Sequence, residues 1–221
     1  MYKGENLVDF TDTITPEVLQ FTADYEYLAF RSGPNKILVF DMATRNIQKE
    51  FTYSEKIVDY SIASNLEYVA LVGYYGSFTK IKDCVTDKEL CEYKFDYPIH
   101  TVEFMSDNST IIYGLGGIGQ VAHMRYNAST NSLVCIRMIE NLFKSGTDVT
   151  ALSCSIDSRF VACGGSLGDY SVKIIDLHGG KTVQSHDKLH TYNVKSVKIS
   201  KNSRFIATSG EDSSVNILVF K

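Results

Sequence analysis

The chain has 221 residues, of which 44% are hydrophobic, with 22 Lys and Arg against 26 Asp and Glu. This length and composition fit a single globular domain with a sizeable core. The net charge of −4 gives no global basic field, which argues against nucleic acid or an anionic membrane surface as the partner.

A pattern of strand, polar turn and second strand occurs five times along the chain. The spacings between consecutive polar turns are 41, 42, 50 and 45 residues, which suit four-stranded propeller blades. Apolar residues alternate with polar ones beside these turns, as half-buried strands require, and helical spacing is not sustained anywhere. The aligned polar turns contain Asp24, Asn65, Asp107, Asp157 and Asn202.

The pattern predicts an all-β propeller with five recognisable four-stranded blades, either part of a seven-bladed ring or a closed five-bladed ring. We expect one domain over residues 1–221, with the five blades in 15–221. The predicted strands, in chain order, are 18–22, 27–31, 36–41, 48–52, 57–62, 68–72, 78–82, 90–93, 100–104, 110–113, 120–126, 133–138, 149–153, 160–164, 171–177, 181–184, 194–199, 205–209 and 215–220.

The fifth repeat stops after three strands, so its outer strand is missing from the end of the sequence. The short run 6–11, within residues 1–14, has no strand partners of its own nearby. It could close a ring by completing the fifth repeat, or it could be the outer strand of a preceding blade. Either pairing would protect an otherwise open strand edge.

No motif predicts a cofactor, a metal site or a covalent catalytic site. The glycines of GLGGIG at 114–119 match a dinucleotide-binding spelling, but a strand follows them where such a site needs a helix, so we expect a hairpin turn. The five histidines lack metal-ligand spacing, and the five cysteines form no CxxC pair, which argues against zinc and a disulfide framework. The longest uncharged stretch, 108–124, is too polar to span a membrane.

One polar set has a specific spacing. His190 precedes the first strand of the last repeat, Thr208 lies in its second strand, and Asp212 lies in the following turn. This spacing resembles the buried hydrogen-bond relay of WD-repeat proteins, where the carboxylate ties the turn to the preceding loop. We expect a structural role for all three. The tryptophan that usually completes the relay is replaced by Leu218, and the fourth repeat keeps only Asp169.

The last repeat resembles the WD-repeat family, and the order of segments is most similar to the endoplasmic-reticulum exchange factor for the small GTPase that initiates COPII coats, the family of the prolactin regulatory element-binding protein. The segments that carry this resemblance are 102–134, 147–177 and 188–220. The resemblance implies a protein partner, a small GTPase, and a location at the cytosolic face of the endoplasmic reticulum, with the cytoplasm as the alternative.

The chain departs from that family in two respects. Members are seven-bladed with a membrane anchor after the propeller, whereas residues 15–221 look like the last five blades. The family's cation-binding loop, which contacts the GTPase, belongs to the first blade and has no counterpart here. The resemblance therefore carries over no catalytic residue. The alternatives are a WD-repeat scaffold that only binds partners and, ranked third, an enzyme of the hydrolase or oxidoreductase type.

Overall fold

The computed structural model describes residues 16–22, 25–53, 56–73 and 76–220. The polar turn at Asp24 and the run 6–11 lie outside these described residues. Within them the secondary structure is β throughout, and the strands form five antiparallel sheets in simple chain order, which we call blades 1 to 5. Four sheets contain four strands, and the fifth contains three.

The strand boundaries are as follows. Blade 1 contains β1 (Pro16–Phe21), β2 (Tyr27–Ser32), β3 (Lys36–Asp41) and β4 (Asn46–Thr52). Blade 2 contains β5 (Ile57–Ile62), β6 (Tyr68–Gly73), β7 (Phe78–Asp83) and β8 (Glu89–Lys94). Blade 3 contains β9 (Ile99–Phe104), β10 (Thr110–Leu115), β11 (Val121–Asn127) and β12 (Ser132–Ile139).

The last two blades complete the array. Blade 4 contains β13 (Val149–Cys154), β14 (Phe160–Gly165), β15 (Val172–Asp176) and β16 (Lys181–His186). Blade 5 contains β17 (Val194–Ile199), β18 (Phe205–Gly210) and β19 (Val215–Val219). These elements confirm the all-β propeller predicted from the repeat spacing, including a last blade with three strands in the part of the chain described.

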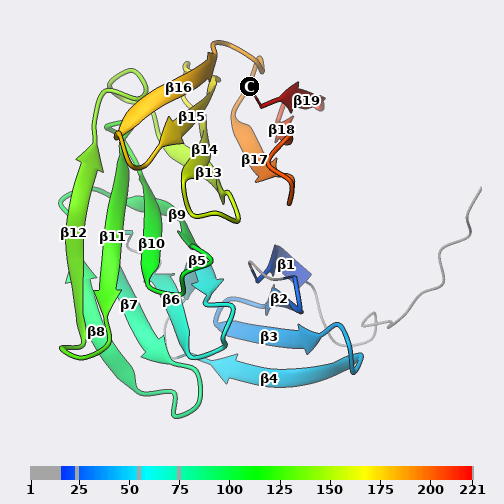
Figure 1. Ribbon diagram of the computed structural model, residues 1–221, viewed down its shortest axis with the longest axis vertical. Helices are drawn as coiled ribbons and strands as arrows, with labels where there is room; N and C mark the ends of the chain where they lie inside the picture. Colours follow the sequence, from blue (N-terminus) through cyan, green and yellow to red (C-terminus); the bar gives the residue numbers. More distant parts are fainter. Residues whose placement is uncertain (1–15, 23–24, 54–55, 74–75, 221) are drawn as a thin grey trace, which may run out of the picture.

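The blades are arranged around a common central axis, as Figure 1 shows, with the first strand of each blade innermost. Four separate clusters of buried apolar side chains fill the spaces between successive blades, from blades 1 and 2 to blades 4 and 5. The hydrophobic core therefore consists of separate layers, each between two neighbouring sheets. Each blade needs its neighbours to bury both of its faces, as expected for a repeat architecture.

Blade 5 differs from the others on its outer side. Val215 and Ile217 of β19 are 71% and 72% exposed, whereas the corresponding third strands of the other blades bury their aliphatic side chains. No fourth strand pairs with β19 among the described residues. The ammonium of Lys201, in the β17–β18 turn, lies 5.6 Å from the ring centroid of Tyr25, in the β1–β2 turn, so blades 5 and 1 come into contact there.

Because every sheet is an antiparallel meander, its loops lie on two opposite faces of the propeller. The turns that join the second to the third strand lie on the same side as the connections between blades, and we call this side the crossover face. GLGGIG lies there, between β10 and β11, with Gly117 and Gly119 at φ values of 73° and 59°. Glycine adopts these left-handed values without a Cβ penalty.

Candidate functional site

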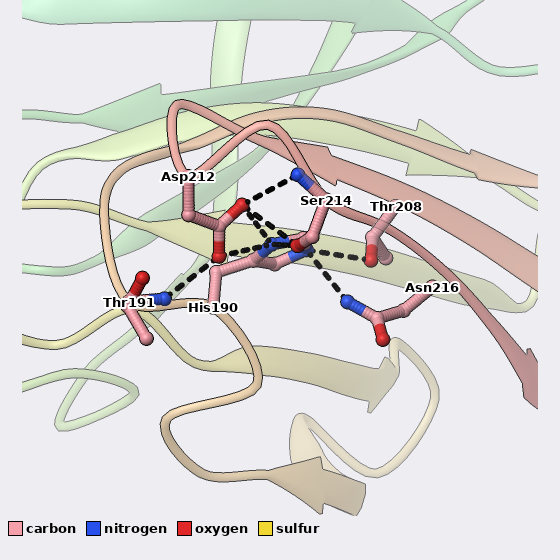
Figure 2. Close-up of polar contacts among 6 residues, drawn as sticks. All are labelled: His190, Thr191, Thr208, Asp212, Ser214 and Asn216. Carbon is pink, nitrogen blue, oxygen red and sulfur yellow. Dashed lines mark hydrogen bonds and ion pairs between the residues drawn. The ribbon is translucent and has the colours of Figure 1, made fainter.

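The structure brings the three predicted relay residues together on blade 5 (Figure 2). His190 lies in the β16–β17 loop, Thr208 on β18, and Asp212 in the β18–β19 turn. His190 Nδ1 lies 3.1 Å from both carboxylate oxygens of Asp212, and Nε2 lies 2.9 Å from the Thr208 hydroxyl. Only 1% of His190 and 2% of Thr208 are exposed.

The Asp212 carboxylate is held by more donors than the sequence predicted. The backbone amide of Thr191 donates to Oδ2 at 2.8 Å, and the hydroxyl and amide of Ser214 donate to Oδ1 at 2.7 and 3.0 Å. The Ser214 hydroxyl and then the Thr191 amide hold the pKa of Asp212 well below its usual range. Because an ionised carboxylate only accepts, His190 Nδ1 carries the proton, and Nε2 accepts from Thr208.

Asn216 is a further relay contact that the sequence analysis missed. Its side-chain amide lies 3.5 Å from His190 Nε2, beside the shorter Thr208 bond. Asn216 pairs directly with Thr208 across β18 and β19, which places both side chains on the His190 side of the sheet. The sequence contained no signal for it, because the alternation of Val215, Asn216 and Ile217 would put the two apolar side chains inward, whereas they are 71% and 72% exposed.

Blade 4 contains a related arrangement around Asp169. Its carboxylate accepts from the amide of Lys144 at 3.1 Å and from the hydroxyl of Ser171, as Asp212 does from Thr191 and Ser214. Burial alone would raise the pKa of Asp169, but these hydrogen bonds outweigh it and lower the pKa. The sequence signal was the shared Asp-x-Ser spacing of 169–171 and 212–214.

In blade 4, however, the imidazole and hydroxyl of the relay are replaced by apolar groups. Phe143, the residue before Lys144, occupies the position of His190, and its ring lies against Gly165 as His190 lies against Gly210. Cys163 takes the position of Thr208, and burial raises the pKa of its thiol to about 12. The same turn is thus supported without a histidine, which agrees with a structural role for the relay.

The inner strands form a second polar set, along the central channel. Ser61, Glu103 and Ser153 each lie four residues before a polar turn, and each accepts from a backbone amide of the next blade. The bonds measure 2.8 Å to the Phe104 amide, 2.9 Å to Cys154 and 3.0 Å to Ile199. This repeated device fastens β5 to β9, β9 to β13 and β13 to β17, whereas the Gln20 side chain of β1 donates to the Ser61 hydroxyl of β5 at 3.0 Å.

The channel itself is a cavity of about 370 Å³ with charges of both signs. The ammonium of Lys198 lies 3.6 Å from Glu103, which raises the pKa of Lys198. Asp59 accepts from the Val102 amide at 2.9 Å, but burial raises the pKa of Asp59 to about 6. Glu103 thus pairs with Lys198 and with the Cys154 amide, and Asp59 pairs with the Val102 amide.

In residues 16–22, 25–53, 56–73 and 76–220, no group of three or more His, Cys, Asp or Glu side chains could hold a metal ion. The same part of the chain contains no helix with the length and apolarity needed to cross a membrane.

The comparisons with known proteins agree with this geometry. Residues 134–176 and 180–217, which cover β12 to β19, match the family described as WD domain, G-beta repeat. The β-propeller domain of Cps50 (Swd1) from Myceliophteria thermophila superposes with a TM-score of 0.72 over 93% of this chain and 66% of that chain, at 14% identity. At this identity the likeness concerns the fold alone.

A curated relative extends the match beyond the last two blades. The yeast protein "Putative guanine nucleotide-exchange factor SED4" from Saccharomyces cerevisiae is 22% identical over 222 residues, covering 96% of this chain. The chain spans only 20% of the length of that relative. By its five sheets, its two matched WD repeats and this similarity, the chain is a β-propeller that carries WD repeats and is similar to a putative guanine nucleotide-exchange factor.

Proposed function

We propose that this chain serves as a propeller of a guanine-nucleotide exchange factor for the small GTPase that initiates COPII vesicle coats, at the cytosolic face of the endoplasmic reticulum. The observation that carries the proposal is the extent of the similarity to SED4, which runs through all five blades and 96% of the chain. Fold likeness could not carry it, because propellers host many unrelated functions.

Exchange of this kind needs binding energy rather than covalent chemistry. The propeller would bind the GTPase and favour a state with a distorted nucleotide pocket. The size of this shift is set by how much more tightly the propeller binds the distorted state than the nucleotide-bound state. The relay on blade 5 has no part in that step, because His190 and Thr208 are buried. Exposed loops are the part of the molecule available for such contacts.

The second candidate is a WD-repeat scaffold, located in the cytoplasm or at the same membrane, that binds partners without accelerating exchange. The polar network favours this candidate. His190 bonds to Asp212 and Thr208 within the relay, and the inner-strand side chains bond to backbone amides of the next blade. WD propellers are protein-interaction domains, so both candidates share a protein partner.

The test mixes this chain with the COPII-initiating GTPase loaded with a fluorescent guanine nucleotide, and measures both binding and nucleotide release. We expect binding, with release near its spontaneous rate, and faster release once upstream blades with the cation-binding loop are joined. If neither version binds or accelerates release, the exchange-factor proposal is wrong and the scaffold remains. Strong acceleration by this chain alone would show that the active loop is not required.

A further inference from the structure

Neighbouring blades pack together by one repeated contact. At the junction of blades 4 and 5, Val197 and Ile199 of the inner strand β17 are 1% and 5% exposed. They pack with Val172 and Ile174 of β15, which are fully buried. Each blade thus offers one face of its third strand to the inner strand of the next blade. The same two inner-strand positions at the other junctions are Tyr60 and Ile62 of β5, Val102 and Phe104 of β9, and Leu152 and Cys154 of β13.

The two ends of the array carry the two halves of this contact. In blade 1, Leu19 and Phe21 of β1 hold the positions of the buried pair in β17, but they are 63% and 47% exposed. In blade 5, Val215 and Ile217 of β19 hold the positions of the buried pair in β15, but they too are exposed. Within the described residues, each end of the array therefore presents one half of a blade junction to solvent.

These two halves do not pack against each other within one chain. A cavity of about 280 Å³, lined by Leu19 and Phe21 on one side and by Ile199 and Lys201 on the other, lies between β1 and β17. The curvature of the array is that of a larger ring, because 93% of this chain superposes on only 66% of the Cps50 (Swd1) propeller domain. Closing the gap would require a new angle at every junction, which closely packed apolar layers resist.

The outer edge of blade 5 differs from the other outer edges in its charge. The outer strands β4, β8, β12 and β16 each contain at least one Lys, Arg or Glu, whereas Val215–Val219 contains no charged residue. Charged side chains on an edge strand discourage pairing with another chain. An uncharged edge beside an exposed apolar face is typical of a surface that another sheet covers.

We propose that blade 5 of one copy packs against blade 1 of a second copy, with Leu19 inserted beside Val215 and Ile217. A second copy is the occupant because each chain carries both halves of the contact, and the new junction repeats the four junctions within the chain at the same angle. The two halves are different surfaces, so the association is head-to-tail and can continue to further copies. This inference does not depend on the proposed exchange activity.

The test measures the mass of the chain in solution by light scattering over a wide range of protein concentration. The mass of the wild-type chain should rise with concentration. Ile217→Lys blocks one half of the junction and Leu19→Lys blocks the other, and each variant alone should remain a monomer. Both side chains are exposed in the single chain, so the changes should leave the fold intact. The matched control, Val85→Lys, replaces an exposed aliphatic side chain in the β7–β8 turn and should associate like the wild type.

Mixing the two variants gives the sharpest result. One intact junction remains possible, between blade 5 of the Leu19→Lys chain and blade 1 of the Ile217→Lys chain, so the mixture should form a dimer and nothing larger. Formation of that dimer also shows that both variants are folded. A dimer of Leu19→Lys alone would overturn the head-to-tail arrangement in favour of contact between two copies of blade 5. A wild-type chain that stays monomeric at every concentration would show that the proposal is wrong.

Discussion

The hydrogen bond between Thr208 and His190 allows a quantitative prediction of stability. Thr208→Val removes the hydroxyl that lies 2.9 Å from His190 Nε2 and leaves this buried nitrogen with only the Asn216 amide at 3.5 Å. An unsatisfied buried polar group costs about 1–3 kcal/mol. Since each kcal/mol lowers the melting temperature by roughly 2–4 °C in a chain of this size, we expect a decrease of roughly 2–12 °C.

A double variant tests the physical cause of that loss. His190→Phe alone should also destabilise the chain, because the Thr208 hydroxyl loses its acceptor. The combination of His190→Phe and Thr208→Val should cost less than the sum of the two single changes, because paired apolar groups leave fewer orphaned polar atoms. Phe143 and Cys163 in blade 4 are the natural precedent for that combination.

Urea denaturation and thermal melting of the parent, both single variants and the double variant provide the measurement. Thr182→Val on the exposed strand β16 is the matched control, and it should change stability by less than about 0.5 kcal/mol. Single variants that melt like the parent would refute the idea that the relay bonds stabilise the blade. Strictly additive losses would refute the coupling between His190 and Thr208.

Two further predictions concern the channel and the ends of the chain. The pKa of Asp59 is raised from 3.8 to about 6, so the folded chain favours the protonated carboxyl. The contribution of Asp59 to the free energy of unfolding is therefore complete below pH 3.8 and is lost as the pH rises through about 6. Asp59→Asn should therefore gain stability over the parent at neutral pH and lose that advantage in acid, and equal differences at both pH values would contradict it. If residues 6–11 complete blade 5, deleting residues 1–11 should lower the melting temperature clearly, whereas an unchanged melting temperature would indicate an open array of five blades.

Most of the strand order could be predicted because it depends on local signals. Alternation of apolar residues and the polar turns placed β5 at 57–62 and β17 at 194–199, as the structure shows. Boundaries differ by one or two residues elsewhere, for example at β4, which begins at Asn46 rather than at 48. Such ends depend on cross-strand pairing, which a single strand's sequence does not determine.

The polar contacts between blades were beyond sequence reasoning. Glu103 lies 51 residues before the amide that it binds on Cys154 and 95 residues before Lys198, and only the curvature of the array brings the three together. Sequence reasoning also failed to find that Phe143 takes the place in blade 4 that His190 has in blade 5. The connection before β13 is longer than the connections before β5 and β9, so alignment by spacing fails there.

Three bonds between innermost strands run the same way, from a backbone amide of the later blade to a side chain of the earlier blade, whereas Gln20 and Thr150 donate in the opposite direction. Ser61, Glu103 and Ser153 always offer the acceptor to an amide of the blade that follows in sequence. During synthesis the earlier blade is made first, so each new inner strand meets an acceptor already in place. Ser61 stands between two blades, because its hydroxyl accepts from the Phe104 amide of blade 3 and from the Gln20 side chain of blade 1, so its loss should loosen both junctions of blade 2.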